Sequence, residues 1–310
     1  MEYKVYKLKF QGAVHFGRRN LEDGEYTFCA DMLFSALFQE ALKMDENASD
    51  CLLRYVQDGK LLLSDAFPYI GGTYFLPKPM KRITVGHDHG DSKMKKALKK
   101  LKYIPVQELE NYLLGRFDVR TSPDMEEALG DFQMKVSAAV RGEEETKPYR
   151  IGNYYYRQGN GLYVIIGYED AGIAEFVEQL LMGVGKVGIG GKKTSGAGKF
   201  ELMTGKMPEE LRERLIKQGE RYMTLSLSLP RDDELEDTLM EAEYILVKRS
   251  GFVDSSDYAR EQRRKKDLYV IKTGAYLKTR FEGDVYNVAD GSGSHPVYRY
   301  AKPMFMEVDV

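Results

Sequence analysis

The sequence predicts an α+β protein built from two ferredoxin-like modules, with an insertion in the first. In residues 1–205, segments with strand and helix periodicity follow one another in the order β-α-β…β-α-β. This patterning is lost between about residues 81 and 148 and returns from residue 162, and a similar, smaller alternation follows toward the C-terminus. We therefore expect a first module at 1–205 that contains an insertion at about 81–148, and a second, smaller module at 206–310.

The first strand and helix are predicted from their periodicities. Residues 3–10 alternate between two faces, which is typical of a strand. Apolar residues then recur at helical spacing over 33–42, and Asp31 stands where its carboxylate can accept from the first amides of that helix. Short strands are predicted at 61–64 and 72–76, with prolines between and after them.

The first module ends with a second strand-helix-strand sequence. An apolar run at 162–166 predicts a strand, and apolar residues at helical spacing over 173–184 predict a helix that Gly185 ends. A strand at 199–203 follows a glycine-rich stretch. These elements complete the order that is typical of a ferredoxin-like module.

The C-terminal part shows a similar alternation, although no sequence similarity between the two halves is visible. A polar helix at 208–219 separates it from the first module. Its predicted elements are a strand at 222–229, a helix at 234–242, strands at 244–248 and 268–273, and a strand at 303–310.

Charge and composition limit the classes of function. The chain has 46 Lys and Arg against 48 Asp and Glu, so any nucleic-acid site must be a local concentration of positive charge. Cys29 and Cys51 have neither CxxC nor zinc-site spacing, and we expect reduced thiols. The sequence has no signal-peptide pattern and no run of about 18 apolar residues. We therefore expect a cytoplasmic protein that does not enter a membrane.

The strongest local signal is the glycine-rich loop at residues 185–198. Its glycines permit positive φ angles and allow backbone amides to approach a polyanion, and Lys192, Lys193, Thr194 and Ser195 add side-chain donors. The alternative is that the glycines serve only a tight turn. A dinucleotide-binding or Walker loop is unfavoured, because the loop follows a helix and lacks a Gly-Lys-Ser or Gly-Lys-Thr ending.

This loop resembles the one that identifies the RAMP superfamily of CRISPR RNA-binding proteins. Residues 188–201 are similar to the loop of the subunit that caps the guide-RNA 5′ tag in type III-A (Csm) interference complexes. Further blocks follow the family's order at residues 10–17, 30–37, 63–68, 75–79, 250–253 and 295–303. Little of 81–148 is recognisable.

The resemblance implies a non-catalytic protein that binds the crRNA 5′ tag. Its expected partners are the large polymerase-like signature subunit and the repeated backbone RAMP subunit. A thumb-like hairpin that inserts into the guide is expected within 131–149. The residues expected to bind RNA are His15, Gly17, Arg18, Lys135, Arg141, Gly188, Gly190, Gly191, Lys192, Lys193, Thr194, Ser195, Gly196, Gly198 and Arg249.

Two rival functions stay open at this stage. His15 lies roughly where guide-processing endoribonucleases of the superfamily place a base, but no second proton-transfer group is identifiable, so RNA contact or loop ordering is favoured over catalysis or an incidental surface position. A purely protein-binding scaffold is the other rival. We expect no catalytic residue, no cofactor and no metal, because His87 and His89 stand alone in a glycine-flanked loop.

Overall fold

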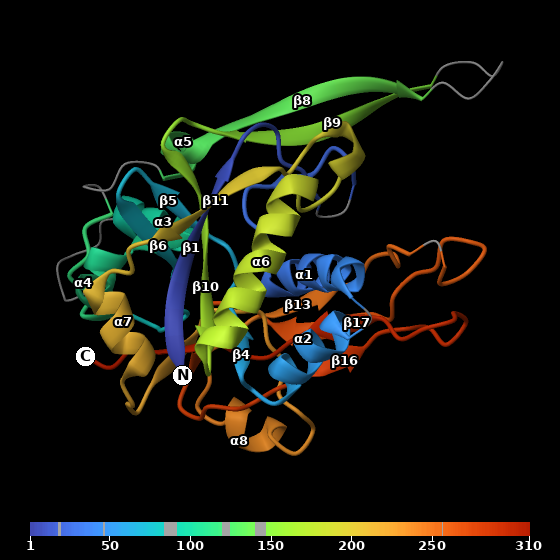
Figure 1. Ribbon diagram of the computed structural model, residues 1–310. Coiled ribbons are helices and arrows are strands. Elements are labelled where there is room, and N and C mark those ends of the chain that lie inside the picture. Colours follow the sequence, from blue (N-terminus) through green and yellow to red (C-terminus); the bar gives the residue numbers. More distant parts are fainter. Residues whose placement is uncertain (18–19, 46, 84–91, 120–124, 140–146, 256) are drawn as a thin grey trace.

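Figure 1 shows a computed structural model of the chain, which describes all residues except 18–19, 46, 84–91, 120–124, 140–146 and 256. Its main feature is a seven-stranded sheet with the order β11-β1-β10-β5-β6-β7, in which β4 also pairs with β10. All of these pairings are antiparallel. The strands are β1 (Glu2–Phe10), β4 (Leu61–Leu63), β5 (Phe67–Ile70), β6 (Thr73–Pro77), β7 (Tyr103–Pro105), β10 (Asn160–Tyr168) and β11 (Phe200–Gly205).

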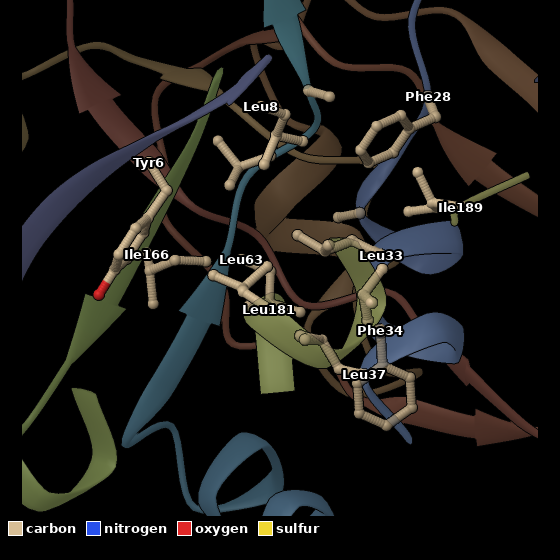
Figure 2. Packing of buried hydrophobic residues seen from close by; sticks show 14 of the residues in the cluster. Tyr6, Leu8, Phe28, Leu33, Phe34, Leu37, Leu63, Ile166, Leu181 and Ile189 are labelled. Atoms are coloured by element: carbon tan, nitrogen blue, oxygen red, sulfur yellow. The ribbon is translucent and has the colours of Figure 1, made fainter. Parts of the chain in front are cut away.

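Both faces of the central strands are covered, which explains why β10 is apolar along its length. On one face, Leu8 of β1 packs with residues of α1 (Ala30–Met44), α2 (Ala48–Gln57) and α6 (Ala171–Val187), as Figure 2 shows in part. On the other face, Val5 of β1 packs with Met223 and Met306 from the C-terminal part. Burial of each large apolar side chain stabilises this arrangement by about 1.5–3 kcal/mol.

The C-terminal part contributes a smaller sheet and two ribbons. The order of the small sheet is β15-β12-β18. The elements of this part are α7 (Glu209–Ile216), β12 (Tyr222–Thr224), α8 (Leu235–Leu239), β15 (Tyr276–Leu277) and β18 (Phe305–Glu307), with the ribbons β13 (Leu246–Arg249) with β14 (Leu268–Ile271) and β16 (Val285–Asn287) with β17 (Tyr298–Tyr300).

The region around the insertion carries a long hairpin that projects from the body of the molecule (Figure 1). It consists of β8 (Gly130–Ala139) and β9 (Lys147–Tyr156), paired antiparallel along their whole length. The other elements here are the ribbon β2 (Phe16–Gly17) with β3 (Gly24–Glu25), and α3 (Ser92–Lys100), η1 (Val106–Glu108), α4 (Leu109–Leu113) and α5 (Met125–Leu129). No helix in the described part of the chain is long and apolar enough to cross a bilayer.

Most predicted elements are confirmed, and several details differ. Helix α2 and strands β5 and β7 were not expected from the sequence. Gly185 does not end α6, which continues to Val187; instead, Gly185 allows the helix to approach Phe200, whose carbonyl oxygen lies 2.6 Å from where a Cβ would be. Asp31 is not the cap of α1, because its carboxylate pairs with Arg249 and Arg299.

Asp65 satisfies the start of α1 and also joins the two halves of the chain. Its Oδ1 accepts hydrogen bonds from the Ala30 amide at 2.8 Å and from the Leu227 amide at 3.1 Å. Its Oδ2 accepts from the Thr273 hydroxyl. Burial raises the pKa of Asp65 to about 6, although these three donors act to lower it. One buried carboxyl thus connects the first helix to two C-terminal segments.

Replacing this carboxyl should therefore destabilise the whole chain. We expect Asp65→Ala to lower the free energy of unfolding by about 3 kcal/mol, because it leaves buried amide donors without an acceptor. Thr273→Val is the matched control, since it removes one of the three bonds, and it should cost about 1 kcal/mol. Urea unfolding measures both. A loss below 1 kcal/mol for Asp65→Ala would show that the carboxyl does not hold the halves together.

Candidate nucleic-acid interface

The glycine-rich loop connects the end of α6 to β11 through the short helix η2 (Lys193–Ser195). Five of its residues have positive φ angles: Gly188, Gly190, Lys192, Gly196 and Gly198. Lys192 has φ 60° although it carries a side chain. This non-glycine residue in the left-handed region indicates a loop conformation that the surrounding structure imposes.

The loop is held against the segment that follows β1 by backbone hydrogen bonds. The Gly191 amide donates to the His15 carbonyl oxygen at 2.9 Å, and the Gly198 amide donates to the Ala13 carbonyl oxygen at 2.9 Å. A Cβ on Gly190 would lie 2.7 Å from the His15 oxygen. Glycine is required here because a side chain would separate the two backbones.

These internal bonds determine which amides remain for a ligand. The amides of Ser195, Gly196 and Ala197 donate to carbonyl oxygens of Lys192 and Lys193 within the turn. Across the residues that the structure describes, the amides of Lys192, Lys193 and Thr194 have no hydrogen-bond acceptor. Because Thr194, Ser195 and Gly196 are exposed, this end of the loop can offer donors to an anion.

The two lysines of the turn lie in different surroundings. The ammonium of Lys192 lies 4.9 Å from the ring centroid of Tyr149 on β9. The ammonium of Lys193 donates to Gln39 Oε1 of α1 at 3.1 Å and lies 3.7 Å from the Asp254 carboxylate. One lysine therefore lies by the hairpin, and the other lies between α1 and the C-terminal part.

His15 is buried, with 4% of its surface exposed, and so it is not an incidental surface residue. Its Nδ1 lies 2.7 Å from the Gly152 carbonyl oxygen of β9, a contact in which only the ring nitrogen can donate. Its carbonyl oxygen accepts from Gly191. His15 thus joins the hairpin to the glycine loop, and its ring has no carboxylate partner among the described residues.

The hairpin carries a predicted residue close to these groups. Lys135 is exposed on β8 and stands opposite Ile151 of β9, while Ser137 stands opposite Tyr149. Because directly paired residues share a face and the side-chain period is two, Lys135 and Tyr149 lie on the same face. This is the face that Lys192 contacts.

Some predicted residues are not placed beside the loop in this way. Gly17 is exposed in β2 near His15, whose Nε2 lies 3.3 Å from where its Cβ would be. Arg18 and Arg141 lie outside the described residues, as do His87 and His89. Among the described residues, no group of three His, Cys, Asp or Glu side chains could hold a metal ion.

Arg249 lies near the loop, but its guanidinium is engaged with Asp31. Its Nε and a terminal nitrogen donate to the two Asp31 oxygens at 2.9 and 2.8 Å, and Arg299 donates to the same carboxylate at 2.8 Å. Burial acts to raise the pKa of Asp31, but the two arginines hold it below its usual value. Sequence reasoning did not find this network, in which a residue from α1 pairs with two from the C-terminal part.

Two solved structures are similar to the whole chain. One is the Csm3–Csm4 subcomplex in the type III-A CRISPR-Cas interference complex, with TM-score 0.65, 18% identity, and coverage of 98% of each chain. The other is a Csm1–Csm4 cassette in complex with pppApA, with TM-score 0.64, 20% identity, and coverage of 99% of this chain and 98% of that one. This fold is therefore one found in subunits of type III CRISPR-Cas complexes.

Sequence comparison gives the family. The CRISPR system Cms protein Csm4 of Mycobacterium tuberculosis is 35% identical over 307 residues, which cover 99% of this chain and 98% of that protein. The protein of the same name from Streptococcus thermophilus is 33% identical over 325 residues, covering 100% of both. The model of the CRISPR Csm4 C-terminal domain matches residues 217–308. The chain belongs to the Csm4 family.

The close approach at Gly190 can be tested by comparison with Gly196, because both have positive φ but no atom lies within 4 Å of a Cβ at Gly196. Gly196→Ala should cost about 1 kcal/mol of stability from backbone strain. Gly190→Ala should cost about 1–3 kcal/mol more, because its methyl group also meets the His15 carbonyl oxygen. Urea unfolding of both variants provides the measurement. Equal losses of stability in the two variants would mean that the loop does not pack closely against the segment after β1.

Proposed function

We propose that this chain binds the 5′ tag of a crRNA, without catalysing its cleavage, as a subunit of a type III-A (Csm) effector complex in the cytoplasm. The observation that carries the proposal is the turn at Lys192–Ser195, in which Thr194 and Ser195 are exposed. It combines amides that have no acceptor among the described residues with two lysine ammonium groups. Such a turn suits phosphate oxygens of a single strand, in a chain whose net charge of −2 cannot attract RNA as a whole.

The strand order supports two ferredoxin-like modules, at 1–205 with the insertion at 81–148, and at 206–310. The order β11-β1-β10-β4 corresponds to 4-1-3-2 in a β-α-β-β-α-β unit. In the second module, Glu243 stands in the position of the second strand and forms an isolated bridge with Tyr276 of β15. Read from Glu243 through β15, β12 and β18, the order is 2-3-1-4, which is the same order read from the other end. The helix expected before the last strand is missing from the fully described residues 277–305.

The other RNA-binding residues have supporting roles in this proposal. Lys135 adds a positive charge on the hairpin face that Lys192 contacts, and Arg141 and Arg18, which lie outside the described residues, would add two more positive charges. His15 positions the loop through its carbonyl oxygen and its ring. Arg249 supplies positive charge, although Asp31 takes its two strongest donor positions. The glycines at 188, 190, 191, 196 and 198 set the loop's shape, and Gly17 leaves room for the His15 ring, whose Nε2 lies 3.3 Å from where a Cβ would be.

The geometry of His15 favours binding over cleavage. A general base needs a ring nitrogen that reaches the attacking hydroxyl, and cleavage also needs a group that protonates the leaving oxygen. In this chain, Nδ1 is occupied by the Gly152 carbonyl oxygen, and the ring is almost fully buried. We therefore assign His15 a positioning role.

The partners follow from the Csm4 family. The similar structures contain Csm4 with Csm3 in one case and with Csm1 in the other. We propose that this chain likewise contacts the large polymerase-like signature subunit, Csm1, and the repeated backbone RAMP subunit, Csm3. Its place at the tag end of the guide would anchor the large subunit there.

Removing the two lysines of the turn tests phosphate binding. Lys192→Ala combined with Lys193→Ala should weaken guide loading for any tag sequence and reduce the salt slope by up to about two contacts. The matched control is Lys186→Ala with Lys199→Ala, which removes the same charge from exposed positions on either side of the turn, Lys186 at the end of α6 and Lys199 just before β11. Retained guide RNA is measured against salt in the reconstituted complex. Equal losses in both pairs, or none in either, would reject phosphate binding by the turn.

His15→Ala separates positioning from catalysis. In cells, guide maturation should be unchanged, because His15 has no carboxylate partner among the described residues and its Nδ1 is already occupied. Guide retention by the complex should fall about tenfold, the scale of the one hydrogen bond that is lost, from the His15 ring to the Gly152 carbonyl oxygen of the hairpin. Northern analysis and guide quantification give the two readouts. Accumulation of uncleaved precursor would support the nuclease reading instead.

A further inference from the structure

A groove of about 210 Å³ opens beside the glycine loop, on the side of Lys193. Its lining comes from α1 and residues 188–190, and from residues 249–252 with Asp254 and Tyr298. Figure 1 shows α1 beside the β16–β17 ribbon. The groove has several times the ~30 Å³ that one liquid water occupies, which suits a small planar or anionic group.

Positive charge dominates the lining of this groove. Its charged residues are Lys193, Arg249, Lys265 and Arg299 against Asp31 and Asp254, a net charge of +2 in a chain of net charge −2. Such a local excess of cations in a concave site attracts anions more strongly than isolated surface lysines do.

Lys265 is the cation in this groove that lacks an ion-pair partner among the described residues. Asp31 is shared by Arg249 and Arg299, and Asp254 lies 3.7 Å from Lys193. Burial lowers the pKa of Lys265, and the charges of Arg299 and Arg249 lower it further, against the opposing effect of the Asp31 and Asp254 carboxylates. An anion in the groove would relieve this repulsion.

An exposed aromatic ring lines the same groove. Phe252 retains 50% of its surface exposed, and the Arg264 guanidinium lies 5.5 Å from its ring centroid. The two residues form an isolated β-bridge, which fixes their backbones beside each other. Nucleobases stack on aromatic rings and on guanidinium planes, so this pair can serve as a stacking platform.

We propose that this groove binds one nucleotide of single-stranded RNA, with its base stacked on Phe252 and its phosphate beside Lys193 and Lys265. The proposal rests on the guide-binding function above and adds a base subsite to it. Because Lys193 belongs to both the glycine loop and the groove, a strand that lies along the turn continues directly into the groove. Stacking does not identify the base, and so the subsite tolerates any of the four.

The test uses reconstituted complex and guides that carry the fluorescent base 2-aminopurine at one tag position at a time. In the wild-type complex, stacking should quench one tag position strongly. Phe252→Leu should restore fluorescence at that position and raise the guide dissociation constant about tenfold, the scale of one lost stacking contact. Phe252→Tyr is the matched control and should behave as wild type. Lys265→Ala should reduce the salt slope by about one contact.

The possible outcomes separate this inference from the proposed function. If the wild-type complex retains no guide, the guide-binding function itself fails. If the guide is retained but no tag position responds to Phe252→Leu, the base subsite alone is wrong. The last experiment measures binding of free 2-aminopurine riboside monophosphate. If it binds the full-length chain in a Phe252-dependent way while no tag position responds, the groove is a mononucleotide site, and the RNA proposal is overturned.

Discussion

The candidate site depends on the close backbone contact between the glycine-rich loop and the segment that follows β1. Two hydrogen bonds of 2.9 Å, from Gly191 to His15 and from Gly198 to Ala13, hold the two segments together. The sheet makes this contact possible, because β1 lies between β10 and β11, and the end of β1 pairs with the start of β11 at Phe10 and Phe200. Glycine at the contact positions is therefore a structural necessity, and the exposed turn beyond it is left for a ligand.

This arrangement reconciles the glycine loop's two interpretations, as a tight turn and as an anion site. Residues 188–191 and 198 are packed against backbone and serve the turn, whereas Lys192, Lys193 and Thr194 retain amides without acceptors in the described structure. The local placement of cations also explains how a chain of net charge −2 can bind a polyanion. The hairpin, the turn and the groove beside α1 gather cations into one region of a chain that is slightly acidic overall.

Strands and helices with strong periodicity could be predicted from the sequence, and tertiary contacts could not. Pro68 indicated a connection, yet β5 includes it. Pro68 pairs with Leu162 of β10 on one side, and the pairing of β5 with β6 begins only at Tyr69, so no β6 residue stands opposite the proline. Asp31 was predicted to cap a helix, but its carboxylate accepts hydrogen bonds from two arginines more than 200 positions away in the sequence. The glycine loop was found because its composition is local, whereas the contact of Lys192 with Tyr149 depends on where the hairpin folds.

The most direct test of the account is photocrosslinking in the assembled complex, with 4-thiouridine placed at each tag position of the guide and the attachment sites mapped by mass spectrometry. The account predicts that crosslinks in this chain concentrate in residues 188–198 and on the face of the hairpin that carries Lys135 and Tyr149. Crosslinks confined to other subunits, or to surfaces of this chain away from the glycine loop, would contradict it.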